Sequence, residues 1–382
     1  MTTLSLSALG AKLGDPEWAA ARISVTYQPS GGPGARIFPP TFPTQNDDRS
    51  PYLFETRRAG DGQETEAVVL DQVPSQANRC EESIAAAWRR GEIALPMLRL
   101  RHEGAAEFEL TGLEAPHRVF DAYWRDSLLD GVKFDRTDVG QAIQAASLDD
   151  ATALLRHDPG TLVYGGWNSH RKGRQAKFPR LYSSEIIGWN PALGSRKAGR
   201  MDPANLTGSR SGEGDEWSYA PTAAKKADAK LSEIGHGNIA PNPAHGGVTI
   251  SEASRIAILS LSATRRLRFG SLNAKAVVAA QVLLAAMSLL GDRLAFGDAG
   301  LWLRSGCDLV VQSERLEWVG RGGITEEFTL SPEQAIALFR EAMTSAQEAG
   351  VDLHLETIEL TASKALGHAL DFSLTKADSS GD

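Results

Sequence analysis

The stretch "NAKAVVAAQVLLAAMSLL", residues 273–290, is the most apolar segment of this 382-residue chain. The run from 276 to 290 is almost entirely apolar, although it contains Gln281, and this predicts a helix that is buried on most sides. Because the fifteen residues of that run are too few to cross a bilayer, we expect the helix to lie in the core of a soluble protein.

The elements around this helix set the fold class. Downstream, the pattern predicts a strand at 307–312, a helix at 331–350 closed by Gly350 and a strand at 351–360. Upstream, we expect strands at 21–28, 66–73, 161–167 and 181–189 and helices at 78–91 and 116–129, whereas 251–269 fits either type. Such a mixture of helices and strands predicts an α+β fold.

Composition limits the class of protein. A hydrophobic content of 42% and a charged content of 23% are typical of a soluble globular protein with one large domain or two. The first twenty residues lack the basic and apolar regions of a secretory signal. Cys80 and Cys307 suit neither a disulfide framework nor a metal site, so we expect a cytoplasmic protein without metal.

Long insertions interrupt the expected core. Residues 29–51 contain six prolines, which predicts a long surface loop. Residues 191–246 are dominated by Gly, Pro, Ser and charged residues, which predicts an insertion or flexible arm. We therefore expect one core over residues 1–382, with a loop insertion at 29–51 and a basic loop and arm at 165–246.

Positive charge is concentrated in one segment. Residues 164–200 contain eight Lys or Arg and one acidic residue, so this segment carries +7 and the remainder of the chain carries -15, for a total of -8. Within it, "GGWNSHRKGRQAKFPRLYSS" (165–184) mixes cations with Trp167 and Phe178. The asymmetry indicates a site for a polyanion such as single-stranded nucleic acid, or else a solvated basic loop.

Three further motifs have both a structural and a functional interpretation. In "SQANRCEES" (75–83), Asn78 can cap a helix with Glu81 at its third position, although the same helix end could bind phosphate near Arg79. In "ATRRLRFG" (263–270), arginines on a strand could bind phosphate or protect a sheet edge. The loop "GRGG" (320–323) lacks the spacing of nucleotide-binding motifs and predicts a turn.

Evidence for catalysis is thin. The eight histidines form no metal-binding motif. His236 and His245 lie in loops and could act as general bases, but neither has a partner that the sequence identifies. We expect no enzymatic activity and no cofactor.

Several blocks of the chain resemble one protein family. The blocks are "IFPPTF", "VPSQANRCEES", "LVYGGWNSHRKGRQAKFPRLYSSEIIGWN" and "HGGVTISEASRIAILSLSATRRLRF", in that order between about residues 25 and 270. Together they resemble the Cas-seven-like backbone subunit of type I-G (formerly I-U) CRISPR surveillance complexes (Cascade), a branch of the RAMP superfamily. In that superfamily, "GRGG" is a loose match to a glycine-rich loop.

The resemblance implies a fold and a role. It implies an RRM-like (ferredoxin-like) palm with finger-like and thumb-like insertions, although no aromatic RNP1 pattern is present. Several copies would assemble along one CRISPR guide RNA without cutting it and display its bases to target DNA in antiviral defence. The implied partners are further copies of the chain, a fused Cas-five/Cas-six-like subunit, a large subunit and a recruited helicase-nuclease.

The resemblance also points to candidate RNA-binding residues. The blocks place near RNA the residues Gln76, Asn78, Arg79, Trp167, Asn168, Ser169, Arg171, Lys172, Lys177 and Arg180. Local charge adds Arg174, Arg265 and Arg266. Two alternatives stay open: an RNA-processing endonuclease of the same superfamily that uses a loop histidine, and an enzyme that holds a phosphorylated small molecule.

Overall fold

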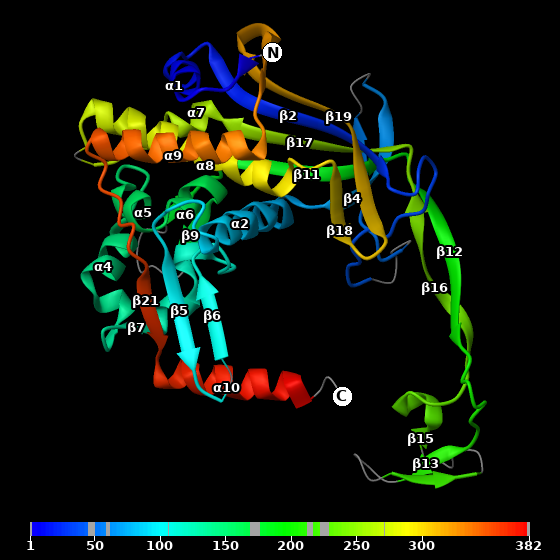
Figure 1. Cartoon of the computed structure of the whole chain (residues 1–382). Coiled ribbons are helices and arrows are strands. Elements are labelled where there is room, and N and C mark those ends of the chain that lie inside the picture. Colours follow the sequence, from blue (N-terminus) through cyan, green and yellow to red (C-terminus); the bar gives the residue numbers. More distant parts are fainter. Residues whose placement is uncertain are drawn as a thin grey trace.

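A computed structural model describes residues 2–44, 50–58, 62–105, 107–168, 176–211, 217–221, 229–270 and 272–379. The protein mixes helices with several sheets, so the α+β class expected from the sequence is confirmed. Figure 1 shows a large sheet with helices beneath it, a long hairpin that descends from one end and a smaller sheet that descends from the other.

The large sheet forms the palm of the molecule, and its described part has nine strands. In spatial order they are β1 (Thr2–Thr3), β20 (Thr325–Thr329), β19 (Cys307–Gly320), β2 (Trp18–Pro29), β17 (Glu252–Ser260), β11 (Tyr182–Trp189), β4 (Glu64–Asp71) and β3 (Phe54–Arg58), while β18 (Gly300–Arg304) pairs with β19. The central strands β19, β2, β17, β11 and β4 are each antiparallel to their neighbours.

Side chains that alternate along each strand show which face of the palm is buried. In β2, Ala21, Ile23 and Val25 are buried, while the residues between them, such as Arg22 and Ser24, lie on the opposite face and are half-buried. This period of two is the signal that predicts the strand at 21–28, which the structure confirms. It also resolves residues 252–260 as a strand rather than a helix.

Helices cover the buried face of the sheet (Figure 1). They are α2 (Val73–Arg89), α8 (Ala274–Phe296) and α9 (Pro332–Glu348), and α1 (Leu6–Gly14) packs against α8. The side chain of Asn273 accepts a hydrogen bond from the backbone N–H of Ala276 at 3.0 Å and so caps α8. This helix is the apolar segment noted above, and it continues to Phe296.

The full length of α8 corrects one expectation. With 23 residues it is long and apolar enough to span a membrane, so shortness does not exclude such a role. Burial is the stronger evidence, because 72% of its most apolar window is covered by the rest of the protein. That burial is consistent with the core helix of a soluble protein.

Three of the expected elements between residues 73 and 167 differ from the prediction in their bounds or in their type. The expected helix at 78–91 begins at Val73 with Gln72 as N-cap, so Asn78 lies in its interior; Gly91 ends it with φ +71° as expected. The expected helix at 116–129 is broken into η1 (Arg118–Phe120), α3 (Ala122–Arg125) and β7 (Ser127–Leu129). The expected strand at 161–167 is α6 (Pro159–Tyr164) up to Tyr164, because Asp158 accepts a hydrogen bond from the N–H of Thr161 and caps a helix there.

The smaller sheet packs beside a group of short helices. Its strands are β6 (Glu107–Thr111), β5 (Leu98–Glu103), β21 (Ile358–Ala362), β7 and β8 (Val132–Lys133), and the helices are α4 (Asp138–Ala145), α5 (Thr152–His157), α6 and α10 (Lys364–Ser379). The strand expected at 351–360 is thus present only from Ile358 onward.

The segment 191–246 is more ordered than its composition predicts. Within the described residues, β12 (Ala192–Arg200) and β16 (Ile239–Thr249) form a long antiparallel hairpin, which we call the arm. Its far end carries β13 (Ser209–Ser211), β14 (Ser218–Ala220), β15 (Ala229–Lys230) and η3 (Leu231–Ile234). At its base, a Cβ on Gly194 would lie 2.5 Å from the carbonyl oxygen of Gly246, so only glycine fits there.

A buried ionic network ties the palm to its helices. Asp292 of α8 forms ion pairs with Arg255 of β17 and with Arg293, whose Nη2 lies 2.7 Å from Asp292 Oδ1. Tyr182 donates a hydrogen bond to Asp292 at 2.5 Å, and Arg293 also pairs with Glu314 at 2.9 Å. Arg255, Tyr182 and Asp292 are each at most 1% exposed, so this part of the network lies in the core, whereas the side chain of Glu314 is 29% exposed.

Candidate nucleic-acid interface

The first part of the basic segment (164–200) contains a short hairpin. Strands β9 (Gly166–Asn168) and β10 (Ala176–Phe178) pair antiparallel, with Trp167 opposite Lys177. The residues between the strands, 169–175, lie outside the described residues, and with them four of the predicted RNA-binding residues. These are Ser169, Arg171, Lys172 and Arg174.

The two faces of this hairpin differ. Trp167 is 52% exposed, and Lys177 Nζ lies 4.6 Å from the centroid of its ring. Phe178 is buried and stacks on Phe120 with ring centroids 6.1 Å apart. Asn168 is also buried and donates a hydrogen bond to Gln144 at 2.7 Å. Alternation therefore turns Trp167 and Lys177 outward and uses Phe178 and Asn168 as anchors.

A buried ion pair supports the entry to the hairpin. Arg118 donates two hydrogen bonds to the Glu81 carboxylate at 2.6 and 2.7 Å and a third to the carbonyl oxygen of Gly165 at 3.0 Å. Burial raises the pKa of Glu81 to about 7, although Arg118 opposes this shift. Arg118 has φ +51°, a strained conformation that its side-chain contacts hold in place.

A cavity of about 660 Å³ opens beside this hairpin. Its lining includes Arg118, Trp167, Lys177, Pro179 and Arg180, and among the described residues none of those that line it is acidic. Partial burial lowers the pKa of the Arg180 guanidinium, and the positive charge of Arg118 adds to that effect. A negatively charged neighbour shifts the pKa of a cation in the opposite direction and would offset both effects.

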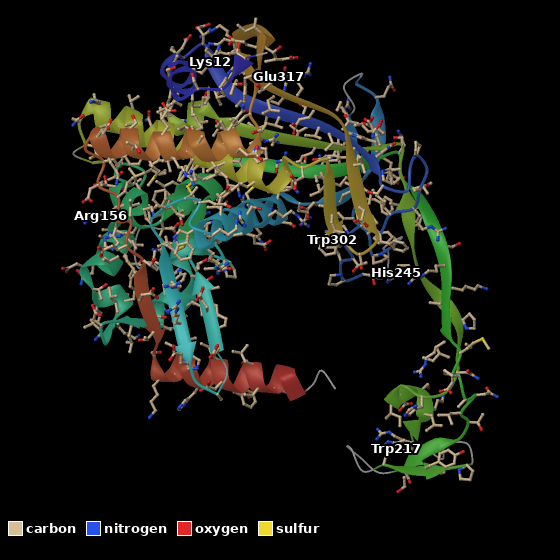
Figure 2. All side chains as sticks on the ribbon, in the orientation of Figure 1. Lys12, Arg156, Trp217, His245, Trp302 and Glu317 are labelled. Atoms are coloured by element: carbon tan, nitrogen blue, oxygen red, sulfur yellow. The ribbon has the colours of Figure 1, made fainter. Side chains whose placement is uncertain are left out.

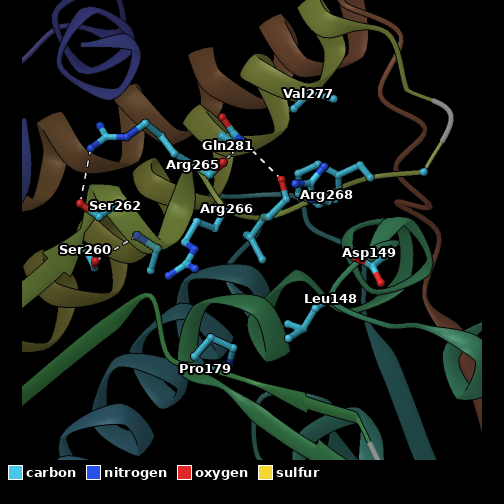
Figure 3. Close-up of a pocket in the computed structure, with 14 residues that line it drawn as sticks. Leu148, Asp149, Pro179, Ser260, Ser262, Arg265, Arg266, Arg268, Val277 and Gln281 are labelled. Atoms are coloured by element: carbon cyan, nitrogen blue, oxygen red, sulfur yellow. Dashed lines mark hydrogen bonds between the residues drawn. The ribbon is translucent and has the colours of Figure 1, made fainter. Parts of the chain in front are cut away.

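A larger cavity of about 1110 Å³ adjoins the first, because Pro179 lines both. Figure 3 shows Arg266 and Arg268 in this cavity, together with Leu148, Asp149 and Pro179. Both arginines are exposed, and within the described ranges neither has an ion-pair partner. The cations of the two cavities therefore lie on either side of Pro179, which lines both.

Arg265, Arg266 and Arg268 do not lie on a strand. They follow the one-turn helix α7 (Leu261–Thr264), and Arg265 donates hydrogen bonds to the carbonyl oxygens of Leu13 and Trp18 at 3.1 and 2.7 Å. Arg265 is thus occupied in holding the N-terminal segment, while Arg266 faces the cavity. Arg268 lines the same cavity as Arg266, although the strand on which the sequence placed these arginines is absent from this described part of the chain.

The block at residues 76–79 lies elsewhere. Gln76 is fully buried, donates to Asp71 at 2.6 Å and accepts from Ser184 at 2.8 Å, so its position gives no support to contact with RNA. Arg79 pairs with the buried Asp71 at 2.8 Å and donates to the carbonyl oxygen of Leu303 on β18 at 3.0 Å. Asn78 is exposed on the surface of α2.

The two histidines that the sequence placed in loops lie at opposite ends of the arm, and His245 is on strand β16 rather than in a loop. The ring of His245 lies 6.3 Å from that of Tyr52 near the palm, whereas the ring of His236 lies 6.0 Å from that of Trp217 at the far end. Figure 2 labels His245 and Trp217 at these two places. Within the described residues, no group of three or more His, Cys, Asp or Glu side chains is placed to hold a metal ion.

Comparison with known proteins agrees with the resemblance in broad terms. Residues 21–192 match the protein family described as CRISPR-associated protein GSU0053 (Cas_GSU0053). No curated protein matches the sequence. The matched region includes Glu81, Arg118, Trp167 and Arg180, but it ends before Arg266. Over residues 21–192 the chain is therefore similar to a CRISPR-associated protein family, which supports a role in CRISPR defence.

Proposed function

We propose that this protein is a non-catalytic subunit that binds CRISPR guide RNA and assembles in several copies along it, as the backbone of a type I-G Cascade complex. The observation that carries the proposal is a pair of adjoining cavities, one lined by Lys177 and Arg180 and the other by Arg266 and Arg268. Cations without acidic partners attract phosphates whatever the base sequence, and this is the requirement for holding guides of many sequences.

The topology of the palm supports the RRM-like part of the proposal. The strands β19, β2, β17 and β11 lie side by side in that order, all antiparallel. Helix α2 lies between β2 and β11 in the sequence, and α8 lies between β17 and β19. This order agrees with the βαββαβ arrangement expected of a ferredoxin-like fold, with β3 and β4 added at one edge and β1 and β20 at the other.

Arginines on the face of the palm opposite the helices are paired with carboxylates, which favours RNA contact beside the palm rather than on this face. Across that face Arg22 lies 2.6 Å from Glu317, and Arg57 is paired with both Glu55 and Glu185. Because these cations already have carboxylate partners, the proposal assigns phosphate binding to the cations of the two cavities next to β10 and α7. The arm and the loop at 29–51 would then be the finger-like or thumb-like insertions.

The proposal is tested by assembly on RNA of defined length. The purified chain is mixed with single-stranded RNAs of 20, 40 and 60 nucleotides, and the mass of each complex is measured by mass photometry. We expect the number of bound copies to rise in proportion to RNA length, with every RNA intact. A fixed stoichiometry would contradict polymerisation, and RNA cleavage that is lost in His236→Ala or His245→Ala would favour an endonuclease.

Removing charge from the basic loop should change the salt dependence of binding. For Arg171→Gln/Lys172→Gln we expect the slope of log K against log salt to become shallower by about 1.4, because each phosphate contact on a single strand contributes about 0.7. Arg58→Gln/Arg156→Gln removes two exposed arginines that are paired with Glu64 and Asp352 and serves as the matched control. If both variants give the wild-type slope, the loop does not bind phosphate.

A further inference from the structure

The cavity at the β9–β10 hairpin contains a cation, Arg180, that could pair with a bound ligand. Arg118 and Arg180 both line it, but Arg118 is bound to Glu81. In the described part of the chain no carboxylate forms an ion pair with Arg180. An anion beside Arg180 would offset both the partial burial and the repulsion from Arg118 that lower its pKa.

An exposed aromatic ring borders the same cavity. Trp167 lines it and is 52% exposed, whereas the neighbouring aromatic Phe178 is buried against Phe120. Lys177 lies over the Trp167 ring with its ammonium group 4.6 Å from the centroid. The hairpin therefore presents a π-face and a positive charge together on its outward side, which suits a nucleobase and its phosphate.

The backbone beside the cavity is closely packed and requires glycine. Gly165 has φ +86°, and a Cβ on Gly166 would lie 2.7 Å from Thr161 Cγ2. The hydrogen bond from Arg118 to the Gly165 carbonyl oxygen anchors the residue that precedes β9. Trp167 therefore follows an anchored residue at the start of the strand.

We propose that this cavity binds one nucleotide unit of single-stranded nucleic acid, with a phosphate at Arg180 and the adjoining base stacked on Trp167. Its volume of about 660 Å³ lies within the usual range for small-molecule sites and accommodates such a unit. The inference rests on the proposed function and adds to it a base contact that does not depend on base identity, because every base has a π-face.

The test separates the base contact from the phosphate contact. Affinity is measured by fluorescence anisotropy for a labelled oligouridylate, for a DNA oligonucleotide of the same length and for an RNA backbone whose bases have been removed. We expect Trp167→Ala to weaken binding of the base-containing strands by about 5- to 150-fold and to leave binding of the abasic strand unchanged. Arg180→Gln should weaken all three and make each salt slope shallower by about 0.7.

Matched variants control for general effects. Trp167→Phe keeps a ring and should restore most of the lost affinity. Trp302→Ala removes another exposed tryptophan, 62% accessible on the β18–β19 hairpin (Figure 2), and Arg58→Gln removes an exposed arginine. We expect neither control to change affinity by more than about twofold, because surface changes away from a site have small effects.

Each outcome decides between the possibilities. If Trp167→Ala weakens binding of the abasic strand as much as that of oligouridylate, the ring does not stack on bases and the inference is wrong. The inference also fails if wild-type protein binds RNA and Arg180→Gln has no effect. If wild-type protein binds none of the three strands, the proposed function itself fails. Stronger binding of DNA than of RNA would assign the site to the target strand.

Discussion

Replacing Asp292 by alanine is expected to lower the free energy of unfolding by about 3–5 kcal/mol, the usual cost of removing one partner from a buried ion pair. Arg255 and Arg293, at most 2% exposed, both depend on this carboxylate, and Tyr182 donates to it. The loss would leave buried positive charge uncompensated in the core. Urea denaturation followed by circular dichroism measures the change.

A surface aspartate provides the control. Asp298 is exposed just after α8, and Asp298→Ala should change the free energy of unfolding by less than about 0.5 kcal/mol. In Asp292→Ala, Arg293 would keep its pair with Glu314. A mild effect would therefore require water or rearranged side chains to compensate Arg255. That outcome would contradict the stabilising role of the Asp292–Arg255 ion pair.

The same network predicts acid sensitivity. Burial alone would raise the pKa of Asp292, but Arg255 and Arg293 overcome this effect and lower it to about 2. Because an unfolded aspartate has a pKa near 3.9, the unfolded state binds the proton more readily, and the stabilisation present above about pH 4 is lost as pH falls towards 2. Asp292→Ala should lack this part of the acid transition.

Replacing Arg118 by methionine is expected to have the second large effect, again about 3–5 kcal/mol of unfolding free energy. It would leave Glu81, 2% exposed, without its bidentate partner and would remove the hydrogen bond to Gly165. The β9–β10 hairpin would then lose its support, so RNA affinity should fall together with stability.

A double variant separates the effect of the unpaired Glu81 charge from the effect of losing the hydrogen bond to Gly165. In Glu81→Gln/Arg118→Met no buried charge is left unpaired, so part of the lost stability should return, whereas the hydrogen bond to Gly165 remains absent. RNA affinity measured at a temperature where both variants are folded should therefore stay low. Arg125→Gln removes an exposed arginine of α3 that pairs with Asp126, and it should change neither property appreciably.

Regular patterns made much of the fold predictable. The strand at 21–28 and the helix at 273–290 were each predicted from a local pattern, alternation in one and a long apolar run in the other. Both predictions are confirmed, as β2 and α8. The sequence predicted an arm but not its strands, because glycines and exposed polar residues suit a solvated two-stranded ribbon as well as they suit a coil. Pairing between β12 and β16 depends on contacts some fifty residues apart, which no local pattern reports.

The candidate site was only partly visible in the sequence for a related reason. Charge concentration pointed to Lys177 and Arg180, which do line a cavity. Glu81 was interpreted as a capping residue because its partner, Arg118, lies 37 positions away. Arg265 and Arg266 look alike in sequence, yet one binds backbone carbonyls and the other faces solvent. Such distinctions depend on which neighbour the fold supplies.

The length of the arm has a mechanical consequence. Strand β12 has nine residues, so the ribbon extends roughly 30 Å from its base at about 3.3 Å per residue. A rotation of about 10° at that base, where Gly194 and Gly246 cross closely, would carry the far end through roughly 5 Å by this lever length. Ile37 of the loop at 29–51 forms a β-bridge with Val248 of the arm. A small change in backbone position at this bridge would therefore move the tip of the arm by about the length of a side chain.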